Sequence, residues 1–192
     1  MRIGLLGGSF DPPHNGHLLA AGDAFESLGL DRLIWMPTAV QPFKVGQASA
    51  TAEQRLRMVR SLVGDDSRFA VDSMEIERGG LSYTVDTLTT LAARWPSAAF
   101  FLLIGADAAA SFAKWRDPRR IAELATLVVL QRAGGDDPEL SSLPAATKVL
   151  ATRRIDISST EIRDRVRQGK SIRGFVPDAV AELIAAERLY QA

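Results

Sequence analysis

The 192-residue sequence contains no cysteine, and this absence excludes several kinds of chemistry at once. Without thiols the chain has no disulfides, no cysteine nucleophile and no cysteine-ligated zinc, and its composition fits a reducing cytoplasm. Neither sign of charge is in excess, since Lys plus Arg and Asp plus Glu number 23 each. Because no net field attracts the chain to polyanions, we expect neither nucleic acid nor a membrane as a partner.

Long hydrophobic runs are missing as well. No apolar segment reaches the roughly 20 residues that a membrane-spanning helix needs. The opening stretch MRIGLLGGSF has a shorter apolar run than a signal peptide has, so we expect a cytoplasmic protein. The length and the 46% of hydrophobic residues suit one domain over residues 1–192 with a single core. The oligomeric state stays open between a monomer and a small homo-oligomer.

Short apolar runs alternate with helical patterns along the chain. The runs are continuous rather than alternating with polar residues, as expected for strands covered by helices on both faces. We therefore predict an α/β fold, a doubly wound, Rossmann-like parallel sheet with helices on both faces. The predicted strands are RIGLL (2–6), LIWM (33–36), FAV (69–71), AFFLLI (99–104), TLVVL (126–130) and KVLA (148–151).

Helix boundaries are marked by recognisable end signals. Thr51 and Gln54 form a capping-box pattern, and Asp117 with Pro118 is typical of a cap followed by the first helical position. Apolar residues from Leu18 to Leu28 repeat at helical spacing, and residues 176–190 predict a closing helix. Residues 133–147 are the most loop-like stretch.

Both histidines of the chain lie in one loop, GGSFDPPHNGH (7–17), between the first strand and the first helix. One interpretation is an H-x-x-H metal site, but no other His or Cys is present to complete it. A second is a pair of packed structural histidines. A third is a phosphate site, because helix N-termini at the carboxyl ends of strands favour anions. The coincidence of strand, glycines, His14 and His17 favours phosphate.

A second candidate phosphate site is ISSTEIR (157–163). Ser158 and Glu161 match a capping box, so an ordinary capped helix explains them. The same segment also gathers three hydroxyls and free N–H groups at a helix start, with Arg163 one turn on.

These motifs resemble those of a known family. GGSFDPPHNGH resembles the (H/T)xGH signature of the nucleotidyltransferase superfamily, and its extended form is similar to that of bacterial nicotinate-nucleotide adenylyltransferases. ISSTEIR is similar to the ISSTxIR motif with which that superfamily holds the phosphates of ATP. The resemblance implies transfer of AMP from ATP to nicotinate mononucleotide, giving deamido-NAD and pyrophosphate. It also implies Mg²⁺ arriving with ATP and no dedicated protein metal site.

The resemblance further implies roles for single residues. His14 and His17 would be catalytic. Gly105 and Asp107 lie in LIGADAAASFAKW (103–115), similar to the family's IGxDxxxxxxxW segment, and would contact the ribose. The implied ATP-binding residues are Gly8, Ser9, Phe10, His14, His17, Gly105, Asp107, Ser158, Ser159, Thr160 and Arg163.

The acceptor nucleotide would be bound by Ser9, Lys44, Thr84, Trp115 and Arg116. Thr84 lies in SYTVDTL (82–88), similar to the family's SYTxDTL. Backbone N–H groups of Trp115 and Arg116 would receive the carboxylate of nicotinate.

Simpler interpretations of these residues stay open. Ser82 or Thr84 could cap a helix, Asp107 could do the same, and Trp115 could belong to the core. Arg116 is most simply a solvated charge. QPFK (41–44) departs from the family's PPHK, because Phe43 replaces the histidine and so removes a polar group. Arg132, by contrast, matches the Arg of the family's RxG motif.

Two rival functions remain at this point. One is a sister enzyme, either phosphopantetheine adenylyltransferase or a form that prefers nicotinamide mononucleotide. SYTVDTL and the IGAD…W segment disfavour the first, and a substrate panel would decide the second. The other is a regulatory module that binds ATP without turnover. Such a module needs no hydrogen-bond donors around a leaving group, so the HNGH and ISSTEIR motifs disfavour it.

Overall fold

The computed structural model describes residues 1–43, 49–132, 141 and 143–191. The strands of this part form a parallel sheet in the order β3-β2-β1-β4-β5-β6. All of the predicted strands are confirmed, as is the doubly wound arrangement. Their bounds are β1 Arg2–Gly8, β2 Arg32–Pro37, β3 Phe69–Val71, β4 Ala99–Gly105, β5 Ala125–Arg132 and β6 Lys148–Thr152.

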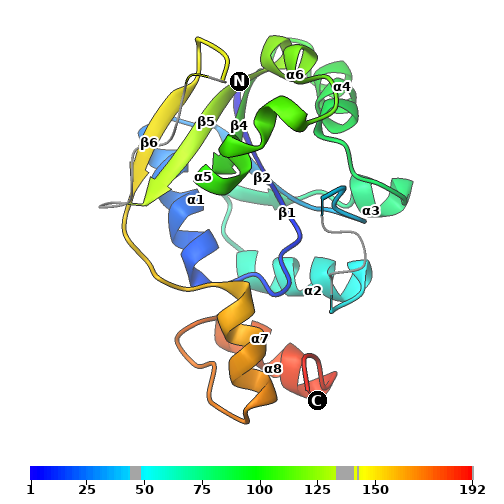
Figure 1. The fold of residues 1–192 in the computed structure, drawn as a ribbon, viewed down its shortest axis with the longest axis vertical. Helices are drawn as coiled ribbons and strands as arrows, with labels where there is room; N and C mark the ends of the chain where they lie inside the picture. The colour runs from blue at the N-terminus through cyan, green and yellow to red at the C-terminus, as the bar shows by residue number, and fades with distance from the viewer. Residues whose placement is uncertain (44–48, 133–140, 142, 192) are drawn as a thin grey trace.

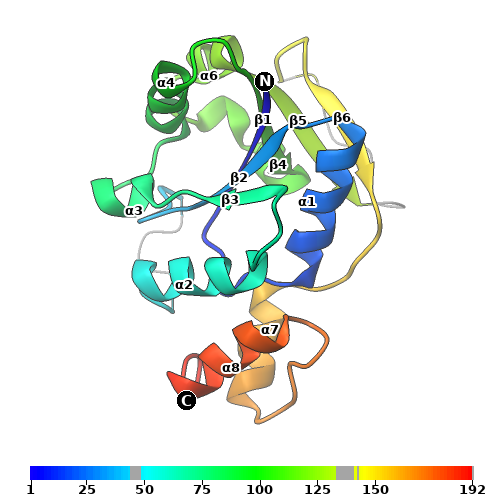
Figure 2. The ribbon, with the colours of Figure 1, turned by 180° about the vertical axis from the view of Figure 1, so that it is seen from behind.

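Helices cover both faces of this sheet (Figures 1 and 2). Along β1, Ile3 and Leu5 enter one core cluster and Leu6 enters the other, because successive side chains of a strand point to opposite faces. One cluster adds residues of α1, α2, α7 and α8, and the other adds residues of α4 and α6. The continuous apolar runs of the sequence therefore reflect burial on both faces.

The predicted helix signals act largely as expected. Thr51 caps α2 through a complete capping box with Gln54, and the Asp117 side chain accepts from the Arg120 N–H with Pro118 at the first position. The helices are α1 Asn15–Ser27, α2 Ala52–Val63, α3 Met74–Arg78, α4 Thr84–Arg94, α5 Ala106–Ala110, α6 Pro118–Leu124, α7 Ser159–Arg167 and α8 Asp178–Ala186, with a 3₁₀ turn η1 at Phe112–Lys114.

Two helix predictions need correction. The closing helix was expected to run to residue 190, but α8 ends at Ala186. Arg188 and Tyr190 adopt left-handed backbone conformations, with φ of 50° and 63°, which cannot continue a right-handed helix. Neither Ser82 nor Thr84 caps α4, because Tyr83 stands at the cap position without a side-chain bond.

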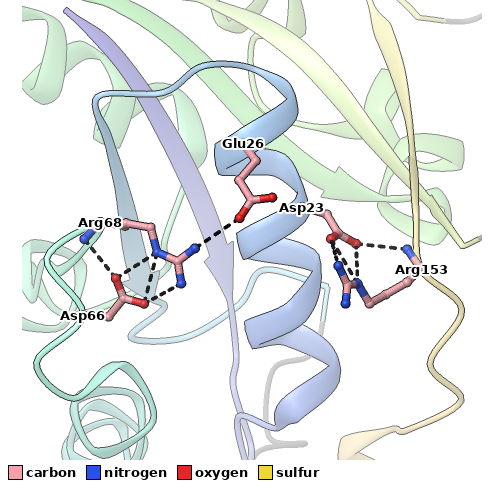
Figure 3. Close-up of polar contacts among 5 residues, drawn as sticks. All are labelled: Asp23, Glu26, Asp66, Arg68 and Arg153. Atoms are coloured by element: carbon pink, nitrogen blue, oxygen red, sulfur yellow. Dashed lines mark hydrogen bonds and ion pairs between the residues drawn. The ribbon is translucent and has the colours of Figure 1, made fainter.

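The carboxyl ends of the strands face α7. In Figure 1, β1 runs from the N-terminus towards α7, and both views place α7 and α8 next to α2. The segment between β6 and α7 is fastened to α1 by Arg153, whose side chain and backbone N–H donate to the Asp23 carboxylate (Figure 3). Among the described residues, no helix is long and apolar enough to cross a membrane.

Candidate active site

A large cleft of about 1120 Å³ opens at the carboxyl edge of the sheet. Its lining comes from the segments that follow β1, β2, β4 and β6, together with residues of α2, α3 and α4. This is the place where ligands bind in doubly wound sheets. The candidate residues that line it are Gly8, Ser9, Phe10, His14, His17, Thr84, Gly105, Asp107, Trp115, Arg116, Ser158, Ser159, Thr160 and Arg163. Lys44 falls outside the described residues, and so does the side chain of Arg132.

The two histidines open helix α1 together. His14 is the residue before the helix, and His17 stands three positions on. Their rings stack with centroids 3.7 Å apart, and His17 Nδ1 accepts the N–H of His14 at 3.3 Å. Because Nδ1 accepts, the proton of a neutral His17 ring resides on Nε2, which makes that atom a donor.

The position of the His14 ring explains why the HNGH sequence has a glycine at residue 16. A Cβ at this position would lie 3.0 Å from His14 Nδ1 and 3.1 Å from its Cε1, so the imidazole would have to shift by a few tenths of an ångström to admit it. The glycine therefore leaves room for the stacked imidazole. His14 itself is buried at 6% exposure, whereas His17 is partly exposed in the cleft.

The second predicted phosphate site lies directly against the histidine loop. Ser159 Oγ donates to the Pro12 carbonyl at 2.8 Å, and Arg163 Nη1 donates to the Asp11 carbonyl at 2.8 Å. Segments about 150 residues apart in sequence are thus held together at one edge of the cleft. Both predicted helix starts, α1 and α7, line it.

The hydroxyls of the ISST segment differ in their partners. Ser158 caps α7 by accepting the Glu161 N–H at 3.1 Å, as the capping interpretation expects. Thr160 Oγ1 accepts from Arg163 Nη2 at 3.2 Å. The segment is therefore both a helix cap and part of the cleft wall, so the two interpretations of it are compatible.

The opposite wall carries aromatic and charged groups. Trp115 is partly buried and packs against the core while also lining the cleft, and its Nε1 donates to Ser111 Oγ at 3.4 Å. The guanidinium of Arg116 lies 4.7 Å from the ring centre of Tyr83 and 3.5 Å from Asp86. Arg116 is therefore more than a solvated charge, because it stacks and pairs at the mouth of the cleft.

The segment after β4 and the QPFK loop also border the cleft. Gly105 stands at the N-terminal cap position of α5, and Asp107 is exposed without a capping bond. The capping interpretation of Asp107 is therefore wrong. Phe43 is 53% exposed on the cleft wall.

Glu75 is a cleft residue that the sequence did not single out. It is buried, and its carboxylate accepts the Thr87 hydroxyl at 2.6 Å and a hydrogen bond from Ser82. Burial raises the pKa of this carboxyl above its ordinary value, against the opposing effect of the two hydroxyls. The only signal in the sequence was an acidic residue ahead of SYTVDTL, which an exposed helix would equally explain.

Buried polar groups also lie behind the histidine loop. Asp11 accepts the hydroxyl of Tyr190 and is buried, and Arg55 of α2 is 2% exposed. Burial, together with the neighbouring Asp11, raises the pKa of Tyr190. Burial lowers the pKa of Arg55, an effect that the charges of Asp11 and Tyr190 oppose. Neither residue was predicted, because a helical Arg and a terminal Tyr are ordinarily surface residues.

Comparison with known proteins places this architecture in a family. A profile of the cytidylyltransferase-like family matches residues 5–165. A probable nicotinate-nucleotide adenylyltransferase of Gemmatimonas aurantiaca is 50% identical, over 100% of this chain and 93% of its own length. One from Thermus thermophilus is 44% identical over 100% of both chains.

Solved structures show the same fold. A Plasmodium falciparum nicotinic acid mononucleotide adenylyltransferase complexed with NaAD superposes with a TM-score of 0.81, covering 98% of this chain and 97% of its own. Its sequence is 18% identical. With full-length relatives at up to 50% identity and the motifs gathered around one cleft, the chain belongs to the nicotinate-nucleotide adenylyltransferases of the cytidylyltransferase-like family.

Proposed function

We propose that this chain transfers the adenylyl group of ATP to nicotinate mononucleotide, forming deamido-NAD and pyrophosphate in NAD biosynthesis. The observation that carries the proposal is a single cleft bordered by the HNGH loop, the ISST helix start and the Trp115 segment. In this proposal the triphosphate and the pyridine ring occupy the same cleft, so that the phosphate of one nucleotide attacks the other directly. Relatives that bear this activity in their names match the whole chain.

The reaction needs no covalent enzyme intermediate. The 5′-phosphate oxygen of nicotinate mononucleotide attacks the α-phosphorus of ATP in line, the bond from the α-phosphorus to the bridging oxygen breaks, and pyrophosphate leaves. Catalysis then consists of positioning and of neutralising charge. His17 Nε2 donates to the α-phosphate oxygens, where charge develops, with His14 packed against it.

The leaving group belongs to the α7 side of the cleft. The N–H groups and hydroxyls at residues 158–160 lie at a helix start, which favours anions, and Arg163 adds a positive charge. We assign the β- and γ-phosphates to this side. Gly8, Ser9, Phe10, Gly105 and Asp107 complete the ATP site on the β1 and β4 sides.

The acceptor belongs to the opposite wall. The ring of Trp115 stacks on the pyridine, and the backbone N–H groups of Trp115 and Arg116 bind its carboxylate. Ser9, Lys44 and Thr84 complete this subsite. The exposed guanidinium of Arg116 adds a favourable charge for an acid over an amide.

Magnesium enters the proposal as a component of the ATP complex. In the part of the chain that the structure describes, no three His, Cys, Asp or Glu side chains come together as metal ligands. The cleft fits a cation that is held mainly by nucleotide phosphates and water. When bound, Mg²⁺ would neutralise phosphate charge. We place the reaction in the cytoplasm.

One assay tests the proposal against its rivals. Pyrophosphate release with ATP is measured for nicotinate mononucleotide, nicotinamide mononucleotide and phosphopantetheine. We expect the highest kcat/KM with nicotinate mononucleotide. An equal or higher kcat/KM for either other acceptor would refute the assignment, and ATP binding without pyrophosphate release would indicate a regulatory module.

A further inference from the structure

The buried side chain of Arg55 joins two segments of the cleft wall. Its Nη1 donates to the Ser9 carbonyl at 2.7 Å, and its Nη2 donates to the carbonyls of Thr38 and Ala39 at 2.7 and 2.8 Å. Ser9 follows β1, and Thr38 and Ala39 follow the neighbouring strand β2. One guanidinium therefore bridges the ends of two adjacent strands.

The segment after β2 is held from its other side as well. The Ala39 N–H donates to Ser82 Oγ at 3.0 Å, and the Ser82 N–H donates to the Val40 carbonyl at 2.9 Å. Arg55 on α2 and Ser82 ahead of α4 thus fix residues 38–40 between them. Each of these residues borders the cleft.

A guanidinium is suited to this arrangement for a geometric reason. Three carbonyl oxygens converge on its planar donor fork, whereas the ammonium of a lysine is a compact point charge that cannot reproduce this spacing. Burying a cation is unfavourable unless hydrogen bonds compensate it. Here the carbonyls supply that compensation, and Asp11 supplies an opposite charge nearby.

We infer that Arg55 is a positioning residue for adenylyl transfer, which sets the spacing between the loop that carries Ser9 and the segment 38–40 of the cleft wall. This inference rests on the proposed function. Ser9 contacts both nucleotides in that proposal, so a shift of its backbone moves the attacking and the attacked phosphates relative to each other. Misplacement by about 1 Å can lower an enzymatic rate by a factor of about 100.

The test compares Arg55→Lys and Arg55→Gln with matched changes at Arg57. Arg57 lies on the same helix but is exposed and pairs with Glu187 at 2.6 Å. Steady-state kcat and KM are measured for both substrates at a temperature where thermal melting shows all variants folded. Hydrogen–deuterium exchange is followed in the peptides that carry residues 8–11 and 38–40.

We expect Arg55→Lys and Arg55→Gln to lose about 10- to 100-fold in kcat, with smaller changes in KM, and to exchange faster in both peptides. The Arg57 variants should match the wild type in kcat and exchange. Wild-type kcat in a folded Arg55→Lys or Arg55→Gln protein would overturn the inference, even if its melting temperature fell, because Arg55 would then serve stability alone. Unchanged exchange in both peptides would overturn it as well.

The exchange measurement also separates the two proposals. If the wild-type chain does not transfer adenylate to nicotinate mononucleotide, the proposed function fails. Faster exchange in the Arg55 variants would in that case still support the bridging role. If only one Arg55 variant folds, that variant decides the outcome.

Discussion

The hydroxyl of Tyr190 donates a hydrogen bond to Asp11 Oδ1 at 2.8 Å, although 179 positions separate the two residues. The same carboxylate accepts the backbone N–H groups of Ser49 and Ala50, at 2.8 and 3.2 Å. The backbone carbonyl of Asp11 in turn accepts from Arg163. The end of the chain is therefore part of the scaffold behind the histidine loop.

Removing this hydroxyl should weaken the scaffold without opening a cavity. We expect Tyr190→Phe to lose about 1.5–3 kcal/mol of unfolding free energy, since hydrogen bonds to charged groups contribute about that much. Urea unfolding at pH 7 measures it. Activity should fall only modestly, because the loop keeps its other contacts.

The same variant has a characteristic pH dependence. Burial raises the pKa of Tyr190 above its ordinary value. The protonated hydroxyl therefore contributes its full stabilisation below pH about 10, and this contribution is lost as the pH rises further. The stability difference between wild type and Tyr190→Phe should therefore shrink above pH 10. Parallel stability curves across that range would contradict the assignment.

Replacing Glu75 should stabilise the protein above neutral pH, whereas replacing Tyr190 should destabilise it. Burial raises its pKa, so the contribution of the protonated carboxyl is present below the ordinary value of 4.5 and is lost as the pH rises through the raised pKa. Glu75→Gln stays neutral and keeps an oxygen to accept from Thr87. We expect Glu75→Gln to melt a few degrees above wild type at pH 8, and the gap to close at acidic pH.

The control for Glu75 lies on the same helix. Glu77 is exposed and accepts from Ser73, so Glu77→Gln should leave the melting temperature nearly unchanged at both pH values. A Glu75→Gln protein that melts below wild type at pH 8 would show that the ionised carboxylate is the stabilising form.

Much of the fold was predictable because local signals and tertiary packing agree. The strands are continuous apolar runs since both faces of the sheet are covered, and Thr51 and Asp117 cap helices by local bonds that sequence spacing reveals. The end of α8 was not predictable. Its sequence continues a helical pattern, but Tyr190 adopts a left-handed backbone and bonds to Asp11, a contact set by tertiary structure.

The residues of the candidate site likewise fall into those that the local sequence predicts and those that depend on tertiary contacts. Motif residues such as His14, His17 and Ser158 were predicted because their chemistry depends on spacing within a short segment. Arg55 and Glu75 were not, because each acts through distant partners, the carbonyls of Ser9 and Thr38 and the hydroxyl of Thr87, respectively. Helical spacing places Arg55 on the apolar face of α2 with Met58, Val59 and Leu62, but spacing within the helix does not reveal which distant carbonyls its guanidinium reaches.

The Asp23–Arg153 pair fastens the connection that leads into α7 (Figure 3). Asp23→Asn should weaken this attachment, with little effect on stability because the Arg153 side chain is 60% exposed and solvent screens its charge. We expect the KM for ATP to rise a few-fold, since the hydroxyls of α7 follow the connection, while kcat changes less. The control Asp156→Asn breaks an exposed pair with Arg154 in the same connection and should leave this KM unchanged.

Trp115 distinguishes a ring-stacking role from a core role. Trp115→Ala should weaken acceptor binding by about 1–3 kcal/mol, with ATP affinity little changed. Trp95 is the matched control, because it is also partly buried and packs against the same core cluster but does not border the cleft. Equal losses of stability in both variants, with unchanged acceptor KM for Trp115→Ala, would assign Trp115 to the core.

His17 gives the most direct test of the chemistry. Its Nδ1 accepts from the His14 backbone, so Nε2 is the donor that meets charge developing on the α-phosphate. His17→Ala should lower kcat by about two to three orders of magnitude, the usual effect of losing one preorganised donor. His17→Asn keeps a donor with altered reach and should recover part of the loss.

Arg163→Ala supplies the contrast. It should chiefly raise the KM for ATP, because the β- and γ-phosphates are bound both before and during the reaction. Steady-state kinetics of the three variants, with thermal melting as the folding control, separate these effects. The fold should survive His17→Ala, since the residue is partly exposed at the start of α1. A well-folded His17→Ala protein with near-normal kcat would remove His17 from the reaction and leave the stacked histidines with a structural role.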